Sequence, residues 1–466
     1  MNQTTIFDMM YPKYKITKPI RLIELFGGYG SQALALKYLG VKFEHWKLCE
    51  WAVKSIQAYK DIHFPKEYHP YGFMEESKDK LSQYLYDMGI SSNYNEPMTL
   101  EQIKRLSLEN LATICENIYV TNNLVNIQQV KGEDLEIVDT DKYEYIMTYS
   151  FPCQDLSLAG KGKGMSDTST RSGMLWEVER ILTECQELGS MPQVLLMENV
   201  PQVHSLDNMA DFHKWQVRLE ELGYKSYWQD LIATDYGVPQ TRNRCFMVSI
   251  LGDYSYTFPK PIPLKLKLKD MLEDNVDEKY YLSDKMLDYC FGVNQKESKF
   301  PRGERFLQSL QQTNENNVAN TITTNAGNRP TDNFIEVKNK TRQGYLKAED
   351  VNMKTKLCND LIEQGKVKEN DVIRHSYTTS RTNDWEKRSV EQNNLSPTLD
   401  TRCDCLGVVN NMRIRKLTPR ECFRLMGVKD EDFDKVKVNQ SDSSLYHLAG
   451  DSIVVNVIEA IIKELL

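Results

Sequence analysis

Residues 22–40 read LIELFGGYGSQALALKYLG, and they predict the first unit of the fold. The mostly apolar start is typical of a buried strand, and the glycines after it indicate a tight turn. Residues 32–39 then carry a helical pattern, which Gly40 ends. Strand, glycine turn and helix form a βα unit, in which backbone amides can approach a ligand closely.

A second predicted strand, residues 43–49, ends at Glu50. This acidic residue stands about 20 residues beyond the glycines, a separation at which a carboxylate can reach the hydroxyls of a ribose. The turn and Glu50 together predict a site for an adenosine-containing cofactor, although these two features do not say which one.

A third strand is predicted at residues 145–149, in the stretch YIMTYSFPCQ that ends at Gln154. Pro152 stops ladder pairing, so Cys153 would lie at the carboxyl end of the strand, where open α/β sheets bind ligands. Residues 155–171 are rich in Gly, Ser, Thr and Lys and are typical of a loop that closes over a ligand. Taken alone, Cys153 could also be a buried small apolar residue.

Further apolar runs predict the rest of an α/β sheet. Strands are expected at residues 194–197, 224–230 and 245–250, with a helix at 209–222. Strands that alternate with helices predict a doubly wound, mainly parallel sheet of the Rossmann-like kind.

Three other segments carry predictions of their own. Residues 67–129 combine charged helical patterns with polar breaks, and we expect a mostly helical insertion there. Residues 418–427 have Thr, Pro, Glu and Gly at the positions of a capped helix. Residues 449–452 are expected to start a final helix, residues 453–465, that packs on the main sheet.

The alternating pattern stops at residues 258–263, where three prolines within five positions indicate a linker. Short strand-like pieces follow, to about residue 409, with many Asn, Thr, Arg and Lys. They predict a second, β-rich domain with long loops.

Composition sets limits on the class of protein. The chain has 466 residues, a net charge of −8 and 10 cysteines, and this length allows two or three domains. An acidic total argues against indiscriminate nucleic-acid binding but does not exclude a local basic cleft. No signal segment, membrane span or disulfide framework is recognisable, which predicts a cytoplasmic protein with free thiols. Cys403 and Cys405 have no second pair of ligands, so no metal site is predicted.

Cys153, Glu198, Arg242 and Arg244 are all expected at the carboxyl ends of consecutive strands. A thiolate beside arginines is an activated nucleophile, and a carboxylate can accept or shuttle a proton. This set suits attack on an electron-poor ring that is then alkylated at an adjacent carbon. Singly, Glu198 could be the partner of a helix start and the arginines could form surface ion pairs.

Six motifs follow one another along the chain: Phe26-Gly27-Gly28-Tyr29-Gly30, Pro152-Cys153-Gln154, Glu198-Asn199-Val200, Gln240-Thr241-Arg242-Asn243-Arg244, Arg415-Lys416-Leu417-Thr418-Pro419-Arg420-Glu421 and Gly450-Asp451-Ser452-Ile453-Val454-Val455. By these motifs and their order, the chain resembles, over nearly its whole length, the DNA (cytosine-5)-methyltransferases of bacteria and phages.

The resemblance implies methyl transfer from S-adenosyl-L-methionine to carbon 5 of a cytosine that is flipped out of double-stranded DNA. Cys153 would attack carbon 6, and Glu198 would hold N3 and the exocyclic amine. Arg242 would contact the carbonyl oxygen of the cytosine, with Arg244 helping to order the site.

The resemblance also implies a set of cofactor contacts. Glu50 would bind the ribose hydroxyls, Trp51 would lie against the adenine face, and Asp134 would lie near the adenine amine. The full set is Phe26, Gly28, Gly30, Glu50, Trp51, Asp134, Leu135, Pro152, Leu175 and Ser452.

The sequence departs from the family at three positions. Ser31 stands where another Gly is frequent, and Ser150 replaces the usual Gly before Phe-Pro-Cys. Asp451 stands where Asn is usual, which places a carboxylate near a cationic sulfonium. None of the three removes a catalytic group.

By the same resemblance, residues 1–258, completed by 445–466, would form the catalytic domain, and residues 259–444 the target-recognition domain and hinge. We expect a monomer that acts on DNA in a bacterial cytoplasm, is either bacterial or phage-encoded, and has a restriction endonuclease as a candidate partner. The recognised DNA word cannot be predicted.

Three alternatives stay open at the level of sequence. A close branch of the family methylates transfer RNA with the same loop. A nicotinamide-dependent oxidoreductase would use the fingerprint at residues 28–33, but it would leave Cys153, Glu198 and Arg242 unexplained. A catalytically silent DNA-binding relative would have no need of Cys153 and Glu198.

Overall fold

The structure is a computed structural model of the chain. It divides into two compact units, of which the first comprises Met1–Val276, Asp288–Asn333 and Lys416–Leu466, and the second Asp277–Leu287 and Phe334–Arg415. The described residues are 11–65, 72–152, 172–291, 302–324, 326–338, 372–374, 390–391, 406–408 and 412–466.

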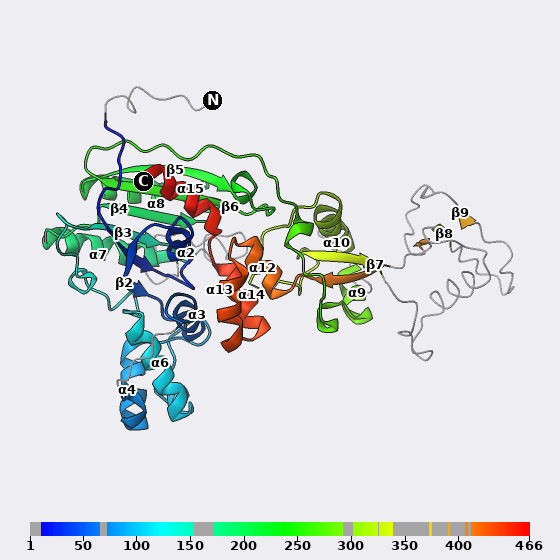
Figure 1. Ribbon diagram of the computed structural model, residues 1–466, viewed down its shortest axis with the longest axis horizontal. Coiled ribbons are helices and arrows are strands. Elements are labelled where there is room, and N and C mark those ends of the chain that lie inside the picture. The colour runs from blue at the N-terminus through cyan, green and yellow to red at the C-terminus, as the bar shows by residue number, and fades with distance from the viewer. Residues whose placement is uncertain are drawn as a thin grey trace. The chain divides into compact units, whose positions relative to one another are not determined.

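A six-stranded sheet forms the centre of the first unit, with the strand order β2-β1-β3-β4-β6-β5 (Figure 1). The strands are β1 (Ile20–Leu25), β2 (Phe43–Cys49), β3 (Glu144–Tyr149), β4 (Val194–Asn199), β5 (Tyr224–Ile232) and β6 (Asn243–Leu251). The first four run parallel, whereas β6 runs antiparallel to both of its neighbours. The predicted Rossmann-like, mainly parallel sheet is confirmed.

Helices cover both faces of this sheet because alternate side chains of each strand point to opposite faces. On one face, Leu25 and Tyr149 pack with Leu182 of α7 and Trp215 of α8 in one buried cluster. Between the apolar positions of β1, Glu24 points to the other face and accepts a hydrogen bond from the backbone amide of Ala33 in α2. The covering helices are α2 (Ser31–Tyr38), α3 (Val53–His63), α7 (Leu175–Glu187), α8 (Met209–Glu221) and α15 (Val455–Leu465).

The final helix, α15, packs against α2. Its buried residues recur at helical spacing, which gives the helix one apolar face, and they are Val455, Val457, Ile458, Ile461, Ile462 and Leu465. Each fully buried aliphatic side chain of this kind contributes roughly 1.5–3 kcal/mol to folding.

The segment expected to be a helical insertion holds the short helix η1 (Phe73–Glu75), α4 (Lys78–Met88), α5 (Leu100–Lys104) and α6 (Leu108–Val120). Ser77, Thr99 and Ser107 cap the starts of α4, α5 and α6 by accepting hydrogen bonds from backbone amides. The helices share a small apolar core of their own, which Ile56 of α3 joins. In Figure 1, α4 and α6 extend from the same end of the sheet as β2 and α3.

The predicted final helix, residues 453–465, is confirmed as α15, which begins two residues later, but residues 449–452 do not start it. Ala449 to Asp451 end helix α14 (Asp442–Asp451), and α15 begins only at Val455. The chain leaves the helix here because its carbonyls are bonded elsewhere: Arg242 donates to the carbonyls of Gly450 and Ser452. The hydroxyl of Ser452 donates in turn to the carbonyl of Ala449.

One described segment, Asp442–Leu465, is long and apolar enough to cross a membrane by length and composition, which the sequence analysis did not expect. It is divided between α14 and α15, and 67% of its most apolar 18-residue window is buried within the fold. A broken, mostly buried segment of this kind is typical of core helices in a globular protein.

Helix α12 (Pro419–Leu425) confirms the predicted capped helix. The Thr418 hydroxyl accepts from the Glu421 amide, while the Glu421 carboxylate accepts from the Thr418 amide. The first unit also holds α10 (Arg302–Leu310), α13 (Asp430–Val436) and the short helices η2 (Gly132–Leu135), η3 (Ser172–Met174), η4 (Pro201–His204), η5 (Ala233–Tyr236), η6 (Leu268–Met271), η8 (Gln311–Glu315) and η11 (Lys437–Asn439).

The described part of the second unit consists mostly of short strands. Strand β7 (Phe334–Lys338) pairs with β11 (Met412–Lys416), and a small antiparallel sheet has the order β10-β8-β9. Its strands are β8 (Val372–Arg374), β9 (Val390–Glu391) and β10 (Leu406–Val408), and the short helix η7 spans Glu278–Tyr280. Helix α9 (Asp284–Phe291) starts in this unit and ends in the first.

Candidate active site

The carboxyl ends of β1, β3 and β4 lie at one edge of the sheet. Cys153, the predicted nucleophile, follows β3 but lies outside the described residues. The chain just before it is tied to β4, because the side-chain amide of Asn199 donates a hydrogen bond to the carbonyl of Phe151 at 3.0 Å. Phe151 is buried, and Pro152 is half-buried beside it. The segment leading to Cys153 therefore starts next to the end of β4, which carries Glu198.

Glu198 and Arg244 form an ion pair at this edge, with Nε of Arg244 3.1 Å from Oε1 of Glu198. Only 9% of the Glu198 side chain is exposed. Burial raises the pKa of its carboxyl group, and the cations of Arg244 and Arg242 act against that rise. A carboxyl group in this setting keeps a proton more readily than an exposed one does.

Both arginines follow the carboxyl end of β5, as expected, because β5 runs parallel to β4. Arg242 immediately precedes the antiparallel strand β6, and Arg244 lies at the amino end of that strand, opposite Leu231 of β5. The two therefore reach the edge of the sheet that carries Glu198, where Asn199 lies opposite Cys245.

Both terminal nitrogens of Arg242 donate to the backbone of two other segments. Its guanidinium donates to the carbonyls of Ile322 at 3.1 Å, Gly450 at 3.0 Å and Ser452 at 2.6 Å. Burial and the neighbouring Arg244 cation lower its pKa. Its Nε atom is buried without a hydrogen-bond partner among the described residues. Arg242 thus joins the chain before β6 to the segment between α14 and α15.

The glycine turn has the backbone that its sequence predicts. Gly28 and Gly30 have φ angles of 55° and 83°, in the left-handed region that favours glycine. A Cβ atom on Gly30 would lie 2.4 Å from Nε2 of His63, so a side chain there would clash as well as strain the backbone. Phe26 adopts a φ of 57° without being glycine.

Glu50 is fixed against this turn. One carboxylate oxygen accepts from the amide of Gly28 at 3.0 Å, and the other accepts from the amide of Ala52 at 2.7 Å. Burial raises the pKa of Glu50 to about 7. The carboxylate is thus held beside the glycine turn, where the sequence analysis expects a ribose.

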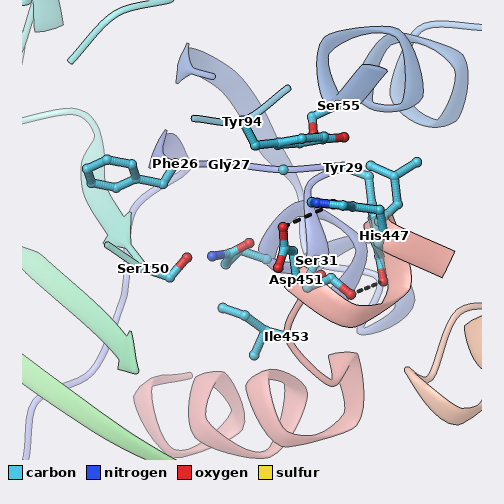
Figure 2. A pocket seen from close by; sticks show the side chains of 14 residues that line it. Phe26, Gly27, Tyr29, Ser31, Ser55, Tyr94, Ser150, His447, Asp451 and Ile453 are labelled. Atoms are coloured by element: carbon cyan, nitrogen blue, oxygen red, sulfur yellow. Dashed lines mark hydrogen bonds and ion pairs between the residues drawn. The ribbon is translucent and has the colours of Figure 1, made fainter. Parts of the chain in front are cut away.

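An open cavity lies against the glycine turn (Figure 2). Ser150, at the end of β3, lines it on the side that leads to Cys153. The hydroxyl of Ser452 and the phenol of Tyr29 are hydrogen-bonded, with their oxygens 2.7 Å apart, which ties the opposite wall to the turn. The lining residues are Phe26, Gly27, Gly28, Tyr29, Ser31, Gln32, Ser55, Tyr94, Ser150, His447, Leu448, Asp451, Ser452 and Ile453.

Of the predicted cofactor residues, Phe26, Gly28 and Ser452 line this cavity, and Glu50 bonds to one of them. The others do not line it. Trp51 packs on the core of the helical insertion, and Leu135 and Leu175 are buried in the core of the sheet.

Asp134 also lies away from the cavity lining. Its carboxylate accepts from the amide of Lys131 at 2.8 Å, which fixes the start of η2. The carbonyl of Leu135 accepts from the indole of Trp46 at 2.9 Å, so η2 is anchored to β2.

Tyr94 and His447 are lining residues that the sequence analysis missed. Tyr94 comes from the helical insertion, in the polar break between α4 and α5. The insertion meets the sheet there, because the amide of Ser91 donates to the carbonyl of Trp51 and the amide of Val53 donates to the carbonyl of Ser91. No period or motif marks such a contact, so sequence offered no signal for it.

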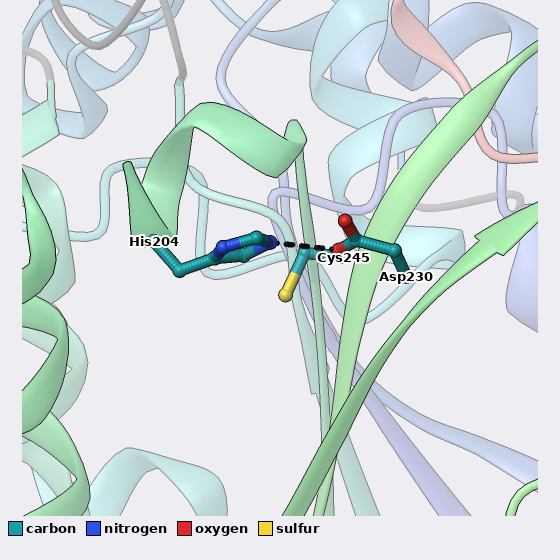
Figure 3. Close-up of side chains that lie close together, drawn as sticks. All are labelled: His204, Asp230 and Cys245. Carbon is teal, nitrogen blue, oxygen red and sulfur yellow. Dashed lines mark hydrogen bonds and ion pairs between the residues drawn. The ribbon is translucent and has the colours of Figure 1, made fainter. Parts of the chain in front are cut away.

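His204 of η4, Asp230 of β5 and Cys245 of β6 lie together (Figure 3). Their potential ligand atoms are all within 4.8 Å of one another. Nε2 of His204 is 2.9 Å from a carboxylate oxygen of Asp230, and Asp230 faces Cys245 across β5 and β6. Burial raises the pKa of the Cys245 thiol, which favours its protonated form. The hydrogen bond explains the cluster without an ion, and the prediction of no metal site stays a prediction.

Comparison with known proteins decides the class of this chain. The model of the family described as C-5 cytosine-specific DNA methylase matches residues 105–466. The chain belongs to this family. As a C-5 cytosine-specific DNA methylase it transfers a methyl group to cytosine in DNA, so the predicted family and enzyme class are confirmed.

Individual relatives agree with the family model. Type II methyltransferase M2.ScrFI of Lactococcus lactis subsp. cremoris is 29% identical over 451 residues, which cover 96% of this chain and 99% of that protein. Orphan methyltransferase M.SssI of Spiroplasma monobiae is 35% identical over 273 residues, which cover 57% of this chain and 68% of that protein.

Two solved structures share the fold of the methylase. The methyltransferase EhMeth of Entamoeba histolytica has a TM-score of 0.53 at 14% identity and covers 96% of this chain and 98% of its own. A DNMT2 of Spodoptera frugiperda has a TM-score of 0.54 at 17% identity, and the match covers 96% of this chain and 99% of that protein. At these identities the likeness concerns the fold alone.

Proposed function

We propose that this methylase uses S-adenosyl-L-methionine to methylate carbon 5 of a cytosine flipped out of double-stranded DNA, through a covalent bond between Cys153 and carbon 6. The observation that carries the proposal is the Glu198–Arg244 pair. It is buried at the edge of the sheet where β3 leads to Cys153, and Ser150 joins that edge to the cavity at the glycine turn.

The covalent step answers a chemical need. Carbon 5 of cytosine is too poor a nucleophile to take a methyl group unaided. When the Cys153 thiolate forms a bond to carbon 6, an electron pair moves through the ring, and carbon 5 becomes nucleophilic. Loss of the carbon 5 proton after transfer then breaks the carbon–sulfur bond and returns the thiolate.

Glu198 would manage charge at N3 of the ring. Because burial raises the pKa of its carboxyl group, the side chain can carry a proton and share it with N3 as electron density builds there. Its position next to Arg244 limits the rise, so the same group can also give the proton up.

The geometry favours exchanging the roles first assigned to the two arginines. The guanidinium of Arg242 donates to three backbone carbonyls, whereas Arg244 lies directly against Glu198. We therefore propose that Arg244 approaches the carbonyl oxygen of the cytosine and that Arg242 holds the surrounding backbone in place.

The residues at the glycine turn fit an adenosine-containing methyl donor. S-adenosyl-L-methionine would supply an activated methyl group on a positively charged sulfur. Gly28 and Gly30 let the backbone approach it closely, and Glu50 stands at the turn with a carboxylate suited to ribose hydroxyls. The contacts proposed for Trp51, Asp134, Leu135, Pro152 and Leu175 rest on the resemblance of their motifs.

The wider assignments remain proposals. We propose residues 1–258 with 445–466 as the catalytic domain and residues 259–444 as the target-recognition domain and hinge. A cytoplasmic monomer, alone or with a cognate restriction endonuclease, is the form in which we expect it to act on DNA.

Methyl transfer to plasmid DNA and to bulk transfer RNA, each with labelled donor, tests the substrate. We expect label in DNA alone, at one short word that bisulfite sequencing of the plasmid would reveal. Label in transfer RNA and none in DNA would favour the RNA branch of the family. Family membership leaves the nicotinamide oxidoreductase without support.

A further inference from the structure

Tyr94, His447 and Asp451 form one wall of the cavity (Figure 2). The rings of Tyr94 and His447 are stacked, with centroids 4.0 Å apart and an interplanar angle of 14°. Nδ1 of His447 lies 3.1 Å from a carboxylate oxygen of Asp451, one helical turn further along α14, at an ion-pair distance but without the geometry of a hydrogen bond. The insertion, the histidine and the carboxylate are therefore linked in a row.

The two ends of this row, at Tyr94 and at Asp451, are each fixed by hydrogen bonds of the backbone around them. The turn that carries Tyr94 is closed by the hydroxyl of Ser91, which donates to the carbonyl of Glu96 at 2.7 Å. At the other end, Arg242 bonds to the carbonyls on both sides of Asp451. The carboxylate thus has a fixed place in the cavity wall.

Asp451 is the one carboxylate among the described residues that line the cavity. Its side chain is 55% exposed, so the group is open to a ligand although protein surrounds it. Burial raises the pKa of Asp451, and the neighbouring side chains of His447 and Arg242 act against that rise. The carboxylates of Glu50 and Glu198 also lie near enough to interact with it. A positively charged ligand in this cavity would meet this carboxylate.

The segment that carries Asp451 is joined both to the glycine turn and to the chain that carries the Glu198–Arg244 pair. On one side, its neighbour Ser452 bonds to Tyr29 in the glycine turn. On the other side, Arg242 joins the same segment to the chain that carries Arg244 and Glu198. In the methyl donor, the sulfonium is bonded to both the ribose and the methyl group, so a donor whose ribose meets Glu50 would bring its positive charge towards Asp451, which interacts with Glu50.

We propose that Asp451 selects the cationic methyl donor over the neutral thioether that remains after transfer, with His447 and Tyr94 positioning its carboxylate. This inference rests on the proposed use of S-adenosyl-L-methionine. The attraction acts on the bound donor and weakens as the sulfur loses its charge, so it favours binding of the donor and release of the product without accelerating the transfer itself.

Titration calorimetry with S-adenosyl-L-methionine and S-adenosyl-L-homocysteine tests the selection. For Asp451→Asn we expect the Kd of the donor to rise about tenfold, which is typical of losing one partly screened charge contact. The Kd of the thioether should change less than about twofold. Glu431→Gln, which removes an exposed carboxylate from α13, is the charge-matched control and should change neither.

The possible results distinguish a failure of the proposed cofactor from a failure of the role proposed for Asp451. If wild-type protein binds neither compound, the proposed cofactor is wrong. If it binds both and Asp451→Asn weakens them equally, Asp451 faces a group common to both, such as the amino group, and the inference fails. Single-turnover transfer adds a second readout, because a slower chemical step at saturating donor in Asp451→Asn would also contradict the proposal.

A measurement on wild-type protein avoids reliance on the fold of the variant. Raising the salt concentration should weaken binding of the donor more than binding of the thioether, because salt screens the contact between the carboxylate and the sulfonium. Equal salt dependence for the two compounds would overturn the proposal.

Discussion

The proposed site has a base side, around Glu198 and Arg244, and a cofactor side, around Glu50 and the glycine turn. The two sides are built from different kinds of contact. On the base side, Glu198 is paired with Arg244, and both are side chains of adjacent strands. On the cofactor side, Glu50 is held by backbone amides, and the shape of the turn comes from Gly28 and Gly30. The base side thus controls charge and proton position, whereas the cofactor side provides a rigid surface.

The largest effect is expected from the base side. Glu198→Ala should lower the rate of methyl transfer by roughly 10²–10⁴-fold, because it removes the group that shares a proton with N3. Affinity for the methyl donor should change little. Single-turnover transfer and donor titration would measure the two effects, with the exposed Glu187→Gln as a control. A loss of donor affinity as large as the loss of rate would contradict the division, because it would mean that Glu198 also serves to bind the methyl donor.

The two arginines sharpen the comparison because they are two residues apart and differ in their contacts. Arg242→Met should lower the free energy of unfolding by roughly 3–5 kcal/mol, because three buried carbonyls lose their charged donor. Arg244→Met should lower the free energy of unfolding by less, because Glu198 can take up a proton when the neighbouring guanidinium is removed.

Denaturant unfolding and methyl transfer would be compared for this pair. We expect Arg244→Met to lose activity out of proportion to its stability, and Arg242→Met to lose both together. The reverse pattern would restore the first assignment, with Arg242 at the base.

The smallest effect concerns Glu24, which lies behind the glycine turn and is fully buried. Burial raises its pKa from 4.5 to about 7, against the hydrogen bonds donated by Tyr59 and Ala33. The folded chain therefore holds a proton that the unfolded chain releases near pH 4.5, so stability should fall as the pH rises from about 4.5 to about 7.

Urea unfolding at several pH values would measure this loss. In Glu24→Gln, the fall in the free energy of unfolding across this pH range should be smaller by roughly 1–3 kcal/mol. Part of the slope should remain, because Glu50 also has a raised pKa of about 7. An unchanged slope in Glu24→Gln would mean that the carboxyl group is ionised in the folded protein.

Much of the sheet was predictable because its signals are local. Strand β2 matches its predicted range of 43–49, and the capping residues of α12 predicted its start. Each of these features depends on the order of apolar, glycine and capping residues within about ten positions.

The features that sequence missed depend on distant parts of the chain. The reversed direction of β6 follows from its pairing with β4 and β5, and the apolar run in 245–250 is the same in either direction. The break at Ser452 depends on Arg242, about 210 residues earlier in the chain. Tyr94 reaches the cavity only because its turn pairs with residues 51–53.

The central claim is that Cys153 bonds covalently to a cytosine at the site marked by Glu198 and Arg244. DNA that carries 5-fluorocytosine at the recognised word should trap this bond in the presence of methyl donor, because fluorine cannot leave as a proton does. We expect a stable protein–DNA adduct that peptide mapping locates at Cys153, and no adduct with Cys153→Ser. An adduct at another residue, or none on DNA that the enzyme otherwise methylates, would contradict the account.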